Sequence, residues 1–322
     1  MYCVNLINMK INNAISLNTK NSKEFSTSNY LPRINFAKRQ KTLANSIKFK
    51  GIGLHSGKKV EMVIRPADSD TGIIFKVKKG PNSFIDIKAD YRNVTSTVLC
   101  TTISNQGYSV STTEHIMSAL YGLNIDNVII ELTDNEVPVM DGSSQAFVNE
   151  ILNVGSVDQE GFIKSIKVKK VVEVQDNDKL VRVSPHNETI ITCEIGFESK
   201  FIGNQSLSLI LKPEIYETQV SSARTFGFMK DVDTLRKNGL ALGGSLENAV
   251  VISDKEILNK DGLRFNDEFV RHKTLDLIGD IALAGHRIIG SIFSYKAGHD
   301  LNNKLLRKIF SSSENWEFIE SY

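Results

Sequence analysis

The chain has 322 residues, of which 41% are hydrophobic and 24% are charged, a composition typical of globular proteins that bury a substantial core. Its formal net charge of +2 is too balanced to indicate a nucleic-acid-binding surface, and no apolar run approaches the roughly 20 residues that span a bilayer. The three cysteines are far apart in the sequence and show no C-x-x-C spacing. They argue against a disulfide framework and a thiolate zinc site, and they fit a reducing compartment.

Residues 1–38 differ in composition from the rest of the chain. They are rich in Asn, Ser and Lys and contain a single acidic residue, Glu24. Such a segment is an organelle-targeting peptide, since these are basic, Ser-rich and poor in acids, or else a disordered tail or the result of a wrongly chosen upstream start codon. Both interpretations stay open, and neither contributes to the fold.

The first half of the folded chain begins near Gln40 and predicts several strands and two helices. The strands are short apolar or alternating runs bounded by Gly, Pro, Asp or Asn: SIKFKGIGL, KVEMVIRP, GIIFKVKK and DNVIIELTD. The first helix lies in STTEHIMSALYGL, where Ser111 is suited to be the N-cap. The second lies in SSQAFVNEILNVG and ends at Gly155.

The second half has the same mixture of elements. A polar, Gly-flanked stretch at residues 155–161 is interpreted as a link between the halves. Strands are predicted in FIKSIKVKKVVEV, KLVRVSPH, TIITCEIGF and SLSLIL, and helices near Asp231–Asn238, in residues 267–284 and in residues 301–310. The element order predicts an α+β fold with one domain at 39–156 and another at 161–322.

Polar residues suited to metal-assisted chemistry occur in three segments. His272 and Asp276 are four residues apart in a helical pattern, so both side chains lie on one face and can grip one ion. Imidazole and carboxylate suit zinc, and a catalytic zinc site needs three protein ligands and an open position. His115 is the best third ligand, and Glu114 beside it can take a proton from water. His299 follows in a Gly-containing loop.

Each of these residues also has a simpler interpretation. A histidine and an aspartate four apart on a helix are commonly an exposed pair that stabilises weakly. Glu114 can close a capping box with Ser111. His299, next to Asp300, can be a feature of a helix start.

Taken together, long motifs in the sequence resemble the UDP-3-O-acyl-N-acetylglucosamine deacetylase family. They are GIGLHSGKKV, STTEHIMSALYGLNIDNVIIEL, PVMDGSSQAFV, SARTFGFM, GLALGGSLENAVV, DGLRFNDEFVRHKTLDLIGD and GHRIIG followed by YKAGHDLNNKLL. The resemblance extends from about Gln40 to about Phe310. It implies an α+β fold of two similar two-layer α/β sandwich domains packed together, with the active site between them.

The resemblance also implies a zinc site and a general base. The family's three Zn²⁺ ligands fall on His115, His272 and Asp276, the same set that the spacing favours. Its general base falls on Glu114. The implied mechanism is zinc-dependent amide hydrolysis.

Other family positions imply supporting roles in catalysis and substrate binding. A second acid–base histidine falls on His299, and an aspartate that supports it falls on Asp280. Thr225 matches a threonine that helps to hold the oxyanion, and Phe226 a phenylalanine that contacts substrate. Lys273 matches the family's lysine and is a candidate to bind the substrate diphosphate.

The implied reaction removes the acetyl group from UDP-3-O-acyl-N-acetylglucosamine, the committed step of lipid A biosynthesis. Lys296 is a second candidate for the diphosphate, although a solvated loop lysine is an equally good interpretation. The acyl chain needs an apolar channel, for which KLVRVSPH and its neighbours are candidates. His55 is interpreted as a structural or supporting histidine.

We expect a monomer in the bacterial cytoplasm with no nucleic-acid partner and no membrane span, or an organelle enzyme if residues 1–38 are a transit peptide. Two rival functions remain. One is a zinc hydrolase that acts on another N-acyl substrate. The other is a zinc-stabilised scaffold that has lost activity.

Overall fold

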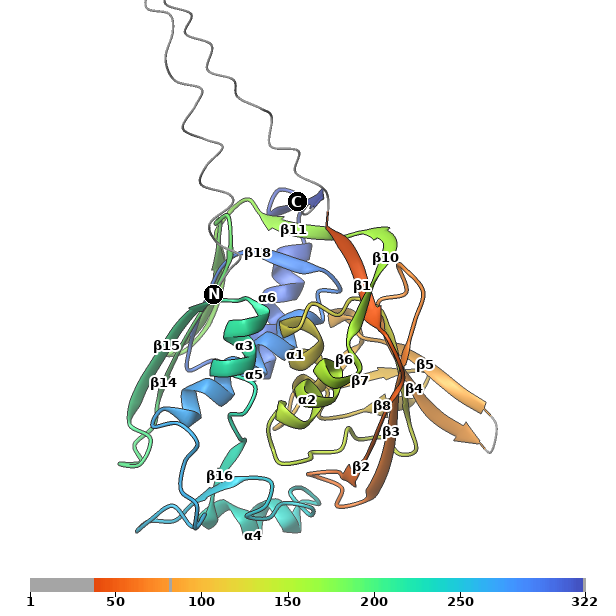
Figure 1. Cartoon of the computed structure of the whole chain (residues 1–322). Coiled ribbons are helices and arrows are strands. Elements are labelled where there is room, and N and C mark those ends of the chain that lie inside the picture. The colour runs from red at the N-terminus through yellow and green to blue at the C-terminus, as the bar shows by residue number, and fades with distance from the viewer. Residues whose placement is uncertain (1–37, 81–82, 321–322) are drawn as a thin grey trace, which may run out of the picture. The chain divides into compact units, whose positions relative to one another are not determined.

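The computed structural model describes residues 38–80 and 83–320, and its first half contains a five-stranded sheet (Figure 1). The prediction for residues 1–38 lies outside this range except for Lys38. The strands follow the order β2 (Ile47–Ile52), β3 (Lys59–Pro66), β9 (Val128–Leu132), β4 (Ile73–Gly80) and β5 (Ser83–Lys88). Burial alternates along β3, where Val60, Met62 and Ile64 are buried. One face of the sheet therefore packs on the core.

Smaller elements complete this half. A three-stranded sheet contains β6 (Val94–Ser96), β7 (Thr102–Asn105) and β8 (Tyr108–Val110), and a short 3-10 helix, η1, covers Tyr91–Asn93. β1 (Arg39–Leu43) pairs antiparallel with β10 (Ser156–Phe162). Residues 155–161, interpreted as a link between the halves, therefore lie almost entirely in a strand, and their role as a link stays a prediction. Every β10 residue is exposed or half-buried, so the strand lacks the alternation that predicts one.

The second half contains a seven-stranded sheet built around β18 (Arg287–Tyr295). Alternate residues of β18, from Ile288 to Ser294, are buried. The strands run in the order β12 (Val172–Asp176), β13 (Lys179–Ser184), β18, β11 (Lys164–Val168) and β19 (Trp316–Glu320), while β14 (Thr189–Gly196) pairs with β18 and with β15 (Asn204–Ile210). The predicted α+β fold is confirmed. The domain limits 39–156 and 161–322 stay a prediction.

The residues that the structure describes form six α-helices besides the two sheets. They are α1 (Glu114–Gly122), α2 (Gln145–Val154), α3 (Pro213–Gln219), α4 (Met229–Lys237), α5 (Glu268–Ala282) and α6 (His299–Phe310). Helix α1 packs on α5, α2 on β2, α5 on β14, and α6 on β12 (Figure 1). The sequence predicts all of them except α3. No helix among residues 38–80 and 83–320 is both long and apolar enough to cross a membrane.

A segment that belongs to neither large sheet precedes α5 in the chain. Residues 226–252 run from β16 (Phe226–Phe228) through α4 to β17 (Val250–Ile252), and β16 and β17 pair in parallel. We call these residues the β16–β17 excursion.

Helix α1 starts later than its sequence predicts. Thr113, not Ser111, is the N-cap, and it makes no side-chain capping bond. The Ser111 hydroxyl instead donates to the carbonyl oxygen of Asn135 at 3.2 Å. Thr112 has φ +56°, so the chain turns between Ser111 and the helix. The prediction of Ser111 as N-cap is therefore wrong.

Helices α1 and α5 approach so closely that their backbones are in contact. All nine residues of α1 are buried. A Cβ atom placed on Gly279 of α5 would lie 2.0 Å from the carbonyl oxygen of Glu114 in α1. Only glycine fits there without moving a helix. This contact places the first turn of α1 against the middle of α5.

We expect Gly279→Ala to lower the free energy of unfolding by about 1–3 kcal/mol, because the added methyl group must push two packed helices apart. Chemical denaturation measures the change. Gly227→Ala is the matched control, since a Cβ at Gly227 meets no atom within 4 Å. Equal stability of the two variants would show that the helices can separate without cost.

Candidate active site

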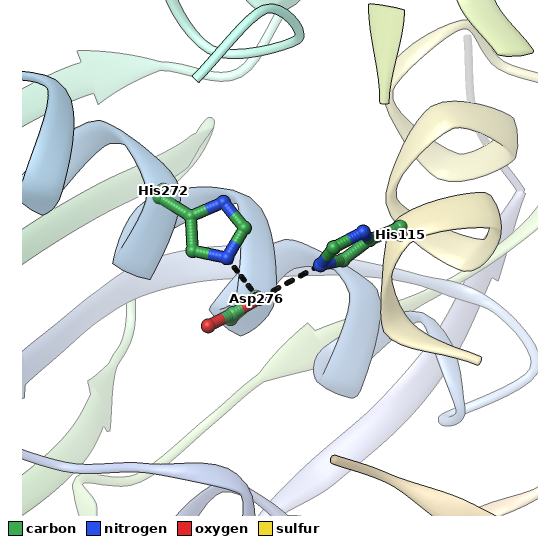
Figure 2. Close-up of side chains that lie close together, drawn as sticks. All are labelled: His115, His272 and Asp276. Carbon is green, nitrogen blue, oxygen red and sulfur yellow. Dashed lines mark ion pairs between the residues drawn. The ribbon is translucent and has the colours of Figure 1, made fainter. Parts of the chain in front are cut away.

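Three side chains from α1 and α5 converge in the interior of the protein (Figure 2). His115 is the second residue of α1, while His272 and Asp276 lie one turn apart on α5. Oδ1 of Asp276 is 3.4 Å from Nε2 of His272 and 3.7 Å from Nε2 of His115. All three residues are buried. The pair on α5 is therefore an interior cluster with His115, which overturns its interpretation as an exposed surface pair.

Burial keeps both imidazoles neutral. Burial, assisted by the neighbouring His272, lowers the pKa of His115 to about 3, and burial likewise lowers the pKa of His272. Nδ1 of His272 lies 3.0 Å from the carbonyl oxygen of Ala223. A carbonyl only accepts, so Nδ1 carries the ring proton and Nε2 presents a lone pair toward Asp276.

Asp276 is ionised although it is buried. Burial opposes the charge, but the adjacent His272 and the ammonium group of Lys273 hold the pKa of Asp276 below its ordinary value. Nζ of Lys273 donates to Oδ2 of Asp276 at 2.8 Å. This bond leaves Oδ1 facing the two imidazoles.

These three residues fit a zinc ion. One ligand atom from each lies within 4.8 Å of the others, and the set offers two nitrogens and one oxygen. Nδ1 of His115 is buried and has no hydrogen-bond partner among the described residues, so the protein does not satisfy this ring as it would a purely structural histidine. Three such ligands leave the open position that a catalytic zinc site requires.

Glu114 lies beside this cluster, and the pKa of its carboxyl group is raised. Burial, opposed by His299 and reinforced by Asp276, raises the pKa of Glu114 to about 7. Its Oε2 accepts a hydrogen bond from the backbone N–H of Thr101 at 3.0 Å. The capping-box interpretation is wrong, because Ser111 is not the N-cap and the Glu114 carboxyl group turns toward Thr101. A carboxyl group poised near neutral pH suits proton transfer.

His299 faces Glu114 from the start of α6. Its Nε2 is 3.9 Å from Oε1 of Glu114, and its Nδ1 is 2.8 Å from Oδ2 of Asp280. Burial opposes a charge on this ring, but Asp280, through its charge and its hydrogen bond, and Glu114 together raise the pKa of His299 to about 9. Asp280 also accepts from Thr101 Oγ1 at 2.6 Å and from Asn302 at 2.8 Å. These bonds fix Asp280, and Asp280 in turn fixes the imidazolium.

The two groups of side chains open into one cavity of about 340 Å³. Both halves of the chain contribute to its wall. Eight of the ten residues that the sequence singles out line it: Glu114, His115, Thr225, Phe226, His272, Lys273, Asp276 and His299.

Comparison with known proteins identifies the family. The profile of the UDP-3-O-acyl N-acetylglycosamine deacetylase family matches residues 40–311. The chain belongs to this family. It is 46% identical to the UDP-3-O-acyl-N-acetylglucosamine deacetylase of Haemophilus influenzae (strain 86-028NP) over 284 residues, which cover 87% of this chain and 93% of the relative. The Pasteurella multocida (strain Pm70) protein of that name shows the same identity and coverage. The Syntrophus aciditrophicus (strain SB) protein is 47% identical over 86% of this chain and 88% of its own length.

As a member of this family the chain is a deacetylase, and therefore a hydrolase. Two of its predicted site residues lie outside the cavity wall. Asp280 lies behind His299, as described above. Nζ of Lys296 forms an ion pair with Asp178 at 2.8 Å, and Lys296 does not line the cavity. Its role in binding substrate stays a prediction.

The cavity of this deacetylase also contains residues that the sequence does not single out. Lys179, the first residue of β13, brings a second cation to the wall, and Leu54 and Leu99 bring apolar side chains. His55, interpreted as structural, lines the cavity too. A lysine at a strand start and leucines in loops have no periodicity that distinguishes them from surface residues.

We expect Asp280→Asn to lower the pKa of His299 from about 9 toward its ordinary value, because the variant removes the charge that opposes burial. NMR titration of the His299 ring protons in chelator-treated protein measures it. Asp300→Asn, which alters an exposed carboxylate next to His299 in sequence, is the control. A His299 pKa that stays near 9 in Asp280→Asn would contradict the assigned cause.

Proposed function

We propose that this chain is a zinc-dependent deacetylase that hydrolyses the N-acetyl group of UDP-3-O-acyl-N-acetylglucosamine. The products are UDP-3-O-acyl-glucosamine and acetate, and the reaction is the committed step of lipid A biosynthesis in the bacterial cytoplasm. The names of relatives that share 46% identity over nearly their whole length support the substrate.

One observation carries the proposal. Two neutral imidazoles and one carboxylate from two helices face a common point, and Glu114 and His299, an acid–base couple 3.9 Å apart, lie next to it in the same cavity. A purely structural metal site needs no proton acceptor or proton donor at its edge. The combination supports amide hydrolysis over a scaffold role.

Glu114 is suited to be the general base. A zinc ion held by the three ligands would lower the pKa of water toward 7 and polarise a carbonyl group. Oε1 of Glu114 accepts the proton of the attacking water, while the N–H of Thr101 holds Oε2 in place. Within residues 38–80 and 83–320, the ion-pair partner of Glu114 is His299 at 3.9 Å, so the carboxylate is available for this transfer.

His299 and Thr225 are suited to stabilise the negative charge that develops on the acetyl oxygen. The raised pKa of His299 keeps its ring protonated at neutral pH, and its Nε2 faces Oε1 of Glu114. His299 and Thr225 both line the cavity, so both can donate a hydrogen bond to the oxyanion. The amine leaves only after it gains a proton. Glu114, protonated in the first step, and His299 are both candidates to donate it. Amide plus water then gives amine plus acetic acid, which ionises to acetate and passes its proton to the free amine or to solvent.

Two lysines are suited to bind the diphosphate. Lys273 of α5 and Lys179 of β13 both line the cavity. Nζ of Lys273 also lies 5.6 Å from the centre of the Phe226 ring, so the aromatic face holds the ammonium in position.

The acyl chain fits the β16–β17 excursion better than β13. Val181 and Val183 of β13 are fully buried in the core, so they are not accessible to a ligand. Met229, Leu242 and Leu246 are instead about half exposed, in the excursion that begins at Phe226. Contact with a fatty chain would remove this apolar surface from water.

We expect Glu114→Ala to retain zinc and to lose about 10²–10⁴-fold in the rate of acetate release, because it removes the base but no ligand. His115→Ala loses both zinc and activity. The measurements are zinc content and acetate release from the UDP-sugar. Glu150→Ala and His186→Ala remove exposed residues of the same types and serve as controls.

Two results would contradict the proposed function. One is Glu114→Ala activity within fivefold of wild type. The other is wild-type protein that releases acetate from N-acetylglucosamine as fast as from the UDP-sugar, which would favour a hydrolase for other N-acyl substrates.

Chelation should abolish activity and leave the secondary structure intact, because α1 and α5 are packed by apolar and backbone contacts that do not involve the ligands. Activity assays and circular dichroism before and after chelation, and after zinc is returned, measure this. Unfolding of the chelated chain would instead support the rival scaffold role.

A further inference from the structure

A single peptide group lies between two side chains of α5. The carbonyl oxygen of Ala223 is 3.0 Å from Nδ1 of His272, and the N–H of the same peptide group, which belongs to Arg224, donates to Oε1 of Glu268 at 2.9 Å. Glu268 and His272 are four residues apart, so they project from one face of α5 one turn from each other. The peptide group is therefore held at both ends by the same helix.

The carboxylate of Glu268 accepts further hydrogen bonds besides the one from the Arg224 N–H. Its side chain is fully buried, and the Arg224 guanidinium donates to both carboxylate oxygens at 2.8 and 3.0 Å. The N–H of Arg264 donates to Oε2 at 2.7 Å. Arg224 also donates to the carbonyl oxygen of Gly262 at 2.8 Å. Four donors thus fix the carboxylate against the segment that carries Ala223.

We propose that Glu268 is a positioning residue that orients His272 through the peptide group between Ala223 and Arg224. This inference rests on the proposed function, since it concerns a proposed zinc ligand. A negative charge next to the N–H draws the electrons of the peptide group toward its carbonyl oxygen, which becomes a stronger acceptor for Nδ1–H. The stronger bond fixes the ring plane and keeps the Nε2 lone pair toward Asp276.

The arrangement also explains why a charged residue is buried at the first turn of α5. Burying an ion pair is costly, and apolar residues of equal volume are often as stable. Glu268 and Arg224 nevertheless occupy this place, next to Thr225 and Phe226 of the cavity wall. Orientation of His272 gives the pair a function that apolar residues cannot supply.

Glu268→Gln removes the charge and keeps the shape of the side chain. We expect it to weaken zinc binding roughly 10- to 100-fold in competition with a chelator, as loss of an outer partner of a metal ligand does. In metal-free protein we expect long-range ¹H–¹⁵N spectra to show the His272 ring, protonated at Nδ1 in wild type, as a mixture of tautomers. Asp267→Asn is the matched control, because Asp267 pairs with Arg271 and does not contact the peptide group.

A double variant separates orientation from stability. Arg224→Met with Glu268→Met removes both charges, so no buried charge is left without a partner, yet the Arg224 N–H still loses its acceptor. We expect this variant to bind zinc as weakly as Glu268→Gln even where its melting temperature matches wild type. Wild-type zinc affinity together with an unchanged His272 tautomer in a folded double variant would overturn the inference.

The same samples distinguish failure of the inference from failure of the proposed function. Wild-type protein that binds no zinc and releases no acetate contradicts the proposed function. The tautomer of His272 is measured without metal, so it still tests whether Glu268 acts on the ring. An identical tautomer in wild type and Glu268→Gln contradicts the inference even if the wild-type enzyme is active.

Discussion

The contact between the backbones of α1 and α5 at Gly279 is the constraint on which the site depends. With no side chain at this position, the carbonyl oxygen of Glu114 lies against α5. This contact leaves Nε2 of His115 3.7 Å from Oδ1 of Asp276, and Oε1 of Glu114 3.9 Å from Nε2 of His299. A larger residue at 279 would push α1 and α5 apart and widen these gaps. The glycine thus sets the geometry of the chemistry without taking part in it.

Polar groups in the middle of two buried helices require partners, and loops supply most of them. Thr101 holds both Glu114 and Asp280, and the Ala223 carbonyl group holds His272. These loop atoms have neither charge nor periodicity of their own. They nevertheless determine which nitrogen of His272 is protonated and how the carboxylates of Glu114 and Asp280 are turned. The helices set the positions of the functional groups, and the loops set their orientations.

The sequence predicted the parts of this arrangement that depend on local periodicity. Five helices, most strands of the two sheets and the common face of His272 and Asp276 follow from spacing, because one turn of helix or one pleat fixes which side chains share a side. Strands β5, β18 and β19 were not predicted. The structure brings His115 to the same point, as the sequence led us to expect. Resemblance to the family supplied residues that spacing cannot reach, such as Thr225 and Asp280.

Other parts could not be predicted, for identifiable physical reasons. Strand β10 is exposed or half-buried throughout, so it has no hydrophobic pattern. Ser111 has the chemistry of an N-cap, but the left-handed turn at Thr112 separates it from the helix. Lys179 reaches the cavity only because β13 begins beside it in three dimensions. Each depends on contacts between distant segments, which a window along the chain does not contain.

The separation of the three ligands along the chain has a consequence for how the protein acquires its ion. Before α1 meets α5, the chain offers only His272 and Asp276 as a local pair, and two ligands hold a cation weakly. If the three proposed ligands hold zinc, tight binding requires that α1 and α5 have already packed together. The proposed ion would then bind the assembled fold and would not direct its formation.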